Sequence, residues 1–134
     1  MAARTVLIVG ATSAIAQAVA RRYAADGAAL FLAARDGARL AAMADDLAGH
    51  AALVAAVRAA FPRLDAALVA YGTLPDQAAV ERDAEAVVAA FTTNATSVVA
   101  LLTRLGALFE ARGRGTLAVI SSVAGDRGRP INYV

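Results

Sequence analysis

Short apolar segments alternate with longer stretches of helical periodicity along the chain. Four segments are apolar without interruption, at residues 6–9, 30–32, 66–69 and 117–120. Continuous apolar runs of this length are typical of parallel β-strands that are buried on both faces. The pattern therefore predicts four strands of a parallel sheet.

The segments between these runs carry apolar residues at helical spacing. Ile15, Val19 and Tyr23 recur every four residues after the first run, and Thr12 or Ser13 can cap that helix. Later stretches show the same periodicity. The longest of them lies near the C-terminal end and carries a continuous apolar stripe of Val88, Phe91, Ala95, Val98, Leu102, Leu105 and Phe109. Further helices are predicted at 36–47, 51–62 and 83–112.

This alternation of strands and helices predicts one α/β domain over residues 1–134, built on a doubly wound, Rossmann-like parallel sheet. One irregularity marks the sheet as incomplete. Only residues 48–50 separate the second and third predicted helices, so the third strand of a Rossmann half is missing. Either this strand has been deleted and the edge rebuilt, or residues of the natural protein are absent from this sequence.

Composition excludes several classes of protein. The chain is 60% hydrophobic and 18% charged, which is typical of a globular domain. It has no cysteine and a single histidine, His50, expected in a surface turn, so disulfides, thiolate metal sites and multi-histidine sites are excluded. No uninterrupted apolar run approaches the roughly 18 residues of a membrane span, and we expect a cytoplasmic protein.

The charge pattern gives little indication of a macromolecular partner. The net charge is only +2, and the arginines are not interleaved with aromatic residues, so we expect no nucleic-acid binding. All 13 basic residues are arginine, and lysine does not occur. The absence of lysine matters for the chemistry considered below.

The turn between the first predicted strand and the first helix has the features of a dinucleotide-binding loop. Gly10 would make the tight turn, and the amides at the helix start would face a pyrophosphate. Ala14 and Ala16 occupy positions where glycine is usual, and each added methyl group would push the cofactor or the packing partner outward. The alternative is an ordinary turn. The residues expected to hold the cofactor here are Gly10, Thr12, Ser13, Ala14 and Ile15.

The end of the second predicted strand bears on the choice of cofactor. An acidic residue at this point binds the ribose hydroxyls of NAD, whereas an arginine accepts the 2′-phosphate of NADP. Arg35 is the better placed group, and Asp36 is explained by a role as the cap of the next helix. We therefore expect NADP, with NAD as the less favoured alternative.

Together these features resemble the classical short-chain dehydrogenase/reductase family. Gly10, Ala14 and Ala16 follow the spacing of the family's glycine loop. Gly72 ends a degenerate form of its Asn-Asn-Ala-Gly segment, and Asn94 matches the active-site asparagine of the long helix. Residues 120–125, Ile-Ser-Ser-Val-Ala-Gly, match the strand-end motif whose second serine, here Ser122, is catalytic.

The resemblance implies an oxidoreductase that transfers hydride between NADP and a small carbonyl or alcohol substrate. Ser122 would bind the reacting oxygen, Asn94 would support a proton-relay water, and Gly72 would lie at the cofactor. The family's tyrosine, thirteen residues after the serine, would be residue 135, and its lysine residue 139. Tyr133 stands at plus eleven, so the chain as given lacks this pair and we expect it to be inactive alone.

Other interpretations of the same residues stay open. Asn94 is also explained as a polar residue bonded within its helix, and a serine pair after a strand commonly begins a turn. The chain could then be a non-catalytic nucleotide-binding or oligomerisation remnant of such an enzyme. A nucleotide-sugar epimerase is a third possibility. In the family the long helix often packs against a partner subunit, so we expect a homo-oligomer at full length.

Overall fold

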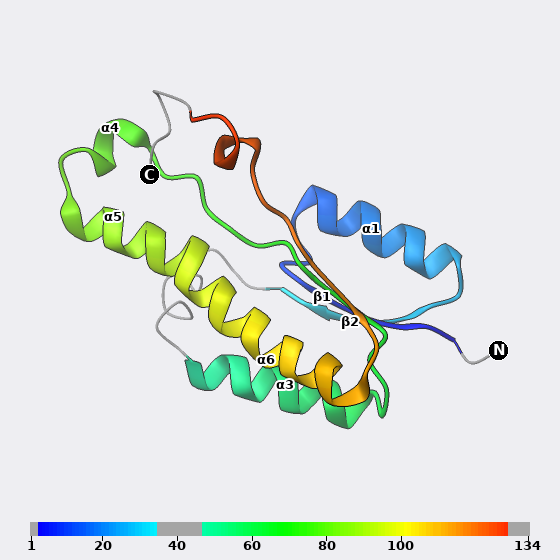
Figure 1. The fold of residues 1–134 in the computed structure, drawn as a ribbon. Helices are drawn as coiled ribbons and strands as arrows, with labels where there is room; N and C mark the ends of the chain where they lie inside the picture. Colours follow the sequence, from blue (N-terminus) through cyan, green and yellow to red (C-terminus); the bar gives the residue numbers. More distant parts are fainter. Residues whose placement is uncertain (1–2, 35–46, 129–134) are drawn as a thin grey trace.

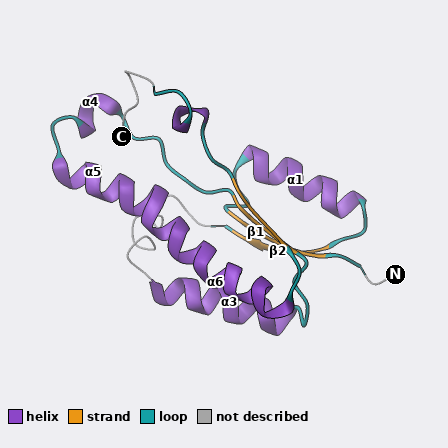
Figure 2. Ribbon diagram, viewed as in Figure 1, coloured by secondary structure: helices purple, strands orange, loops and turns teal. Residues whose placement is uncertain are grey.

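The computed structural model describes residues 3–34 and 47–128, which form a parallel sheet with helices on both faces (Figures 1 and 2). The strand order is β2-β1-β3-β4, and every pairing is parallel. This confirms the predicted doubly wound α/β fold. The strands are β1 (Thr5–Val9), β2 (Ala29–Ala33), β3 (Ala66–Val69) and β4 (Thr116–Val119).

The helices divide between the two faces of the sheet. Helix α1 covers one face, and α3 and α6 lie together on the other (Figure 1). The chain therefore leaves β1 toward one face and leaves β3 toward the opposite face. The helical elements are α1 (Ala14–Ala25), α3 (Leu47–Ala60), α4 (Gln77–Val80), α5 (Ala84–Phe91), the π-helical turn η1 (Thr92–Thr96), α6 (Ser97–Arg112) and the 3-10 turn η2 (Val123–Gly125).

Alternate residues of the strands form two cores, one on each side of the sheet. Leu7 and Val69 point into the core beneath α3 and α6, where Leu101 and Leu105 are fully buried. Ile8 points into the core beneath α1. Because β1 and β3 lie in the middle of the sheet, both of their faces are buried, as the continuous apolar runs predict.

The structure differs from two predictions for the region around the second and third predicted helices. Helix α3 begins at Leu47, so residues 48–50 form its first turn instead of a connection. His50 is 2% exposed, and its expected place in a surface turn is wrong. The predicted helix 36–47 falls almost entirely outside the described residues. Strand β2 is the edge of the sheet within the described residues, consistent with a Rossmann half that lacks its third strand.

The long predicted helix forms, but its apolar stripe is not continuous. The π-turn η1 interrupts the α-helical repeat at residues 92–96, and α5 projects beyond the sheet (Figure 1). A π-turn takes more residues than an α-turn and so rotates the face that continues into the next segment. As a result Phe91 is 61% exposed and Val88 64%, whereas Leu105 is fully buried.

The helix Ala84–Arg112 also has a mean hydropathy of 1.6 over its most apolar window, so by length and composition it could cross a membrane. One such helix in the described part of the chain is weak evidence for a span, because a core helix passes the same test. Here α6 packs on the sheet through Val98, Leu101, Leu105 and Phe109. This packing accounts for the apolar character of its C-terminal half.

Strand β4 departs from the predicted burial. Leu117 is partly buried, but the other three residues of the strand are exposed. Within the described residues β4 is an edge strand, so one side of it lacks a hydrogen-bonded neighbour. Gly115 leads into it with φ +147°, and a β-carbon at this position would overlap the Phe109 ring.

Candidate active site at the carboxyl ends of the strands

The chain leaves β1 and β3 toward opposite faces of the sheet, and this creates a crevice at the carboxyl ends of these two strands. In doubly wound sheets this switch point is where ligands bind, because the connecting loops diverge and leave the strand ends accessible. Most of the site residues predicted from the sequence follow β1, β3 or β4. The fold thus brings segments far apart in the sequence to one edge of the sheet (Figure 1).

Gly10 forms the tight turn at the end of β1. Its φ is +86°, a left-handed conformation that favours glycine. A β-carbon on Gly10 would lie 2.8 Å from backbone atoms of Ala70 and Tyr71, at the end of the neighbouring strand β3. Both the turn and the close approach of the segments that follow β1 and β3 therefore require glycine here.

The start of α1 presents backbone donors near this turn. The Gly10 and Ala11 amides donate to the Ala33 carbonyl, and the Ser13 hydroxyl accepts from the Ala16 amide. Among the described residues no acceptor contacts the amides of Ala14 and Ile15. Unpaired amides in the first turn of a helix, at the positive end of its dipole, are suited to an anion.

The two alanines in glycine positions of this loop have different surroundings. Ala16 is fully buried and packs with Ile8 and Ala70 beneath α1, so its methyl group is part of the core. The Ala14 side chain is exposed. Ile15, expected on the packed face of the helix, is 54% exposed instead and lies outside the core. Thr12 is exposed, and its carbonyl accepts a hydrogen bond from the Gln17 side chain.

A cavity of about 710 Å³ is lined by the predicted site residues that follow β3 and β4 and by the one on the long helix. Its walls come from the segments after β3 and β4 and from the side of the long helix. Gly72, Asn94 and Ser122 all line it, so the structure brings together three residues that stand up to 50 positions apart in the sequence. Leu74, Val98 and Leu102 provide apolar surface in the same cavity.

The Asn94 side chain joins the long helix to the segment after β3. Its Oδ1 accepts from the Thr73 amide at 2.8 Å, and its Nδ2 donates to the Thr73 carbonyl at 2.8 Å. A β-carbon on Gly72 would lie 3.1 Å from Asn94 Oδ1, so a glycine next to Thr73 lets this pairing form closely. Nothing in the sequence marks Thr73 as the partner of Asn94, because the two meet only through the tertiary fold.

Asn94 lies within the π-turn η1, and a second polar link joins this turn to the segment after β3. The Ser97 hydroxyl donates to the Thr93 carbonyl at 2.8 Å, and the Tyr71 hydroxyl lies 2.9 Å from the same Ser97 oxygen. Because a serine has one hydrogen to donate, Tyr71 is the donor in the second bond. Tyr71 also packs on the core beneath α6.

Ser122 caps the short turn η2 after β4. Its Oγ accepts from the Ala124 amide at 3.1 Å, and its backbone is extended. This bond uses one lone pair, so the hydroxyl hydrogen is left to donate to a ligand in the cavity. The chemistry that these residues offer in the cavity therefore rests on hydrogen-bond donors.

Arg35, the residue expected to select NADP, lies outside the described residues. Strand β2 ends at Ala33, so Arg35 follows it by two positions in the sequence. The Ala33 carbonyl accepts from the Gly10 and Ala11 amides, which joins the end of β2 to the predicted phosphate loop.

Comparison with known proteins relates the chain to a family of oxidoreductases. Residues 10–133 match the family model described as enoyl-(acyl carrier protein) reductase. An uncharacterized oxidoreductase of Mycobacterium tuberculosis is 42% identical over 150 aligned residues, which cover 98% of this chain and 60% of that protein. The chain thus spans about 60% of its relative. The alignment is longer than the 134 residues here, so the relative has residues opposite gaps in this sequence.

Solved structures share the fold over nearly the whole chain. Levodione reductase superimposes with a TM-score of 0.83 at 26% identity, covering 97% of this chain and 59% of the reductase. Actinorhodin polyketide ketoreductase, solved with NADPH, gives a TM-score of 0.83 at 24% identity over 98% of this chain and 58% of that protein. At that identity the second likeness shows the fold alone.

Proposed function

The chain belongs to the short-chain dehydrogenase/reductase family, and on that premise we propose that the protein is an NADP-dependent oxidoreductase. The proposed reaction interconverts a carbonyl group and an alcohol on a small-molecule substrate. One observation carries the proposal. Asn94 and Ser122, the two predicted catalytic residues, line a single cavity beside the switch point of the sheet.

The cofactor loop supports nucleotide binding through its backbone. A glycine is required at Gly10, and the amides of Ala14 and Ile15 have no acceptor among the described residues. The methyl group of Ala16 is buried in the core beneath α1. These features fit a dinucleotide whose pyrophosphate accepts from the helix start. When bound, the nicotinamide would supply or accept the hydride.

The preference for NADP rests on Arg35. A guanidinium that follows the second strand is suited to a 2′-phosphate, because its fork of donors pairs with two phosphate oxygens. A charge-assisted hydrogen bond contributes about 1.5–3 kcal/mol, which corresponds to roughly a tenfold to hundredfold preference over NAD. We infer from this that NADP is the physiological cofactor.

Ser122 is the proposed contact to the reacting oxygen. Its hydroxyl donates to the substrate carbonyl while its oxygen stays bonded to the Ala124 amide, which fixes the direction of the donor. Asn94 is bonded twice to Thr73 and still has one N–H and one lone pair for a water molecule. It would thus hold the segment after β3 in place and support the proton-relay water.

We expect the proton donor of the proposed reaction to be a tyrosine outside these residues. By the family's spacing the tyrosine would be residue 135 and its lysine residue 139, and this sequence contains no lysine. A free phenol has a pKa near 10, so only about one in a thousand is ionised at pH 7. No lysine is present among residues 1–134 to lower the pKa of a tyrosine. We therefore expect that these residues alone turn over no NADPH with any carbonyl substrate.

Cofactor titration of the natural protein tests the proposal. NADPH and NADH affinities are measured by fluorescence for the wild type and for Arg35→Ala. We expect NADPH to bind at least tenfold more tightly, and the variant to lose most of that difference. Equal affinities in the wild type would refute the role of Arg35, and no binding of either cofactor would refute the proposed function.

Substitution of the serine pair tests the catalytic assignment. Ser121 and Ser122 both line the cavity, but only Ser122 matches the catalytic serine of the family. We expect Ser122→Ala to lower kcat/KM by about a hundredfold or more, the effect of removing one donor to a developing oxyanion. Ser121→Ala is the matched control, and an equal loss in both variants would contradict the assignment.

A further inference from the structure

A second pocket lies at the amino-terminal edge of the sheet, at the opposite ends of the strands from the crevice. Its volume is about 420 Å³. Strands β1, β3 and β4 are parallel, so the residues that precede them meet at one edge. Each of the three is preceded by an arginine within three positions, and all three arginines line the pocket: Arg4, Arg63 and Arg114.

The strand register sets the spacing of the outer two arginines. Val6 pairs with Ala66 and Ala66 pairs with Thr116, so Arg4 and Arg114, two residues before the outer members, stand at the same level. One strand lies between them, which separates their backbones by about 10 Å. Two guanidinium groups on long side chains can close on a small ligand across that span.

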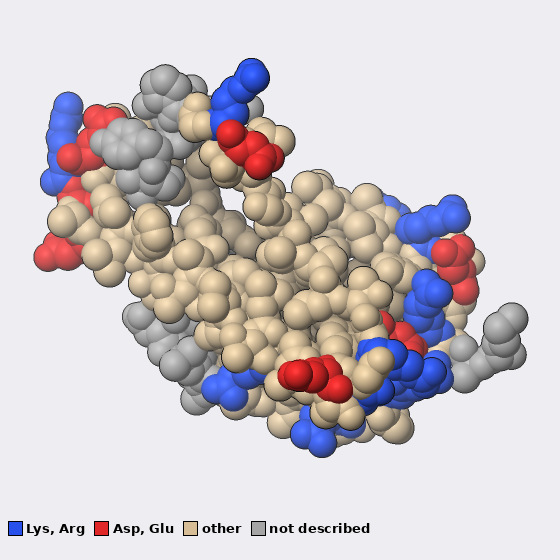
Figure 3. Space-filling view, viewed as in Figure 1, with Lys and Arg blue, Asp and Glu red and all other residues tan. Residues whose placement is uncertain are grey.

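The pocket has an excess of positive charge. Three guanidinium groups and one carboxylate, Asp65, line it, giving a local charge of +2, as large as the net charge of the entire chain. Basic side chains gather at this end of the molecule, near the N-terminus (Figure 3). The excess makes the pocket attractive to an anion.

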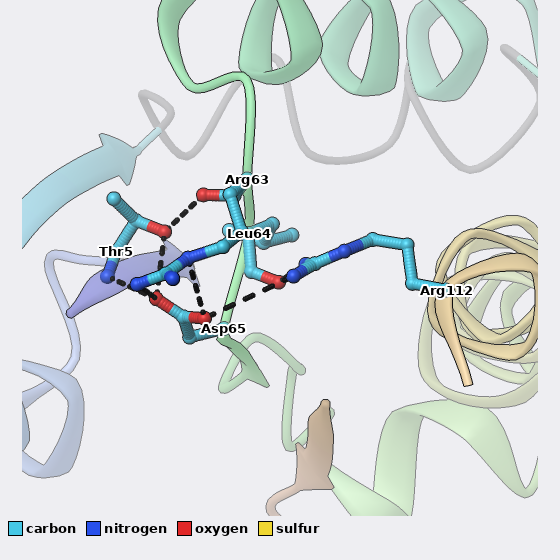
Figure 4. Close-up of polar contacts among 5 residues, drawn as sticks. All are labelled: Thr5, Arg63, Leu64, Asp65 and Arg112. Atoms are coloured by element: carbon cyan, nitrogen blue, oxygen red, sulfur yellow. Dashed lines mark hydrogen bonds and ion pairs between the residues drawn. The ribbon is translucent and has the colours of Figure 1, made fainter. Parts of the chain in front are cut away.

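The single carboxylate is already paired. Asp65 accepts from the Thr5 amide at 2.9 Å and lies 3.1 Å from Arg63 Nε, and Arg112 approaches it from α6 (Figure 4). Arg4 and Arg114, by contrast, form no ion pair with any described residue. Two of the three guanidinium groups are therefore left for a ligand.

Uncharged donors line the same pocket. The Gly115 amide donates to no other described residue, because the hydrogen bond between the strands begins one residue later, at Thr116. Tyr23 and Thr116, whose side chains carry hydroxyl groups, are also among the lining residues. Guanidinium groups, an unpaired backbone amide and side chains with hydroxyl groups can together donate hydrogen bonds to the several oxygens of a phosphate.

We propose that this pocket binds a phosphate group of a small metabolite, at a site separate from the cofactor crevice. Arg4 and Arg114 hold the phosphate from two sides, and the Gly115 amide donates to a third oxygen. Arg63 contributes charge while it remains paired with Asp65. The site does not depend on the proposed redox function, because none of these residues lines the crevice or the 710 Å³ cavity.

Phosphate titration at constant ionic strength tests the site. Inorganic phosphate is added to the natural protein with sodium chloride adjusted to compensate, and its binding is followed by calorimetry and by the Tm. We expect saturable binding, and about tenfold weaker affinity in each of Arg4→Gln and Arg114→Gln, the loss of one charge-assisted contact. Arg82→Gln is the control, because it removes the same charge from an exposed position outside the pocket.

The outcomes separate this site from the crevice. Phosphate binding that is lost in the double variant, Arg4→Gln with Arg114→Gln, while NADPH affinity stays unchanged would support the proposal. Equal stabilisation by chloride at the same ionic strength would overturn it, because general screening would then explain the effect. Saturable phosphate binding that survives the double variant would also overturn it, since the anion would then bind elsewhere.

Discussion

The close approach of β1 and β3 at Gly10 leads to a prediction that compares two glycines. Gly10 and Gly27 have similar left-handed backbones, with φ of +86° and +75°. A β-carbon on Gly27 meets nothing within 4 Å, whereas one on Gly10 lies 2.8 Å from backbone atoms at the end of β3. Gly10→Ala and Gly27→Ala therefore differ mainly in the steric contact at the crevice.

The expected magnitudes follow from these surroundings. An alanine in the left-handed region costs about 1–2 kcal/mol, and this penalty is shared by both variants. The gain from a less flexible unfolded chain is also shared and cancels in the comparison. Overpacking against backbone that cannot rotate away adds about 1–3 kcal/mol at Gly10 only. We expect Gly10→Ala to be less stable than Gly27→Ala by about 2 kcal/mol.

Urea unfolding followed by circular dichroism measures this difference. The free energy of unfolding is obtained for each variant from the midpoint and the m-value. NADPH affinity is the second readout, and we expect Gly10→Ala to lose it while Gly27→Ala retains it. If the two variants unfold within about 0.5 kcal/mol of each other, the strand exits do not approach as described and the crevice argument fails.

Three further perturbations probe other parts of the structure. Asn94→Ala removes both hydrogen bonds to Thr73 and should lower the free energy of unfolding by about 2 kcal/mol in urea titrations; an unchanged value would show that water replaces the amide. Gly115→Ala drives a methyl group into the Phe109 ring and should cost about 3 kcal/mol, measured the same way, and a loss under 1 kcal/mol would contradict that contact. Burial alone raises the pKa of Asp65, but hydrogen bonds and the Arg63 charge outweigh it and hold the pKa below 3.8, so the carboxylate stabilises the fold above that pH. The stability difference between wild type and Asp65→Asn should therefore shrink as the pH falls below 3.8, and a difference that grew instead would reverse the inferred direction.

The local pattern of the sequence was sufficient to predict the strands and the order in which the motifs occur. The run at residues 66–69 became β3 without change, because a buried parallel strand needs apolar side chains on both faces. Ser13 became the cap of α1 because its short hydroxyl side chain suits that position. Gly10 was identifiable because few other residues tolerate a positive φ.

The predicted burial of two residues was wrong. Phe91 was expected on the packed face of the long helix, but the π-turn rotates that face and α5 extends beyond the sheet. His50 was expected in a turn and is buried within α3, because the helix begins earlier than the apolar spacing indicates. The apolar spacing of the sequence reveals neither the π-turn nor the position at which α3 begins.

By itself, the sequence determined which segments are strands, where the chain turns tightly, and which side chains can donate hydrogen bonds. These properties depend on the conformational preferences and polarity of residues close together in the chain. Only the tertiary structure decided that Asn94 is bonded to Thr73, that Ser122 faces the same cavity, and that Arg4 and Arg114 flank one pocket. Those contacts join residues more than 20 positions apart, and they exist because parallel strands place their ends together at one edge of the sheet.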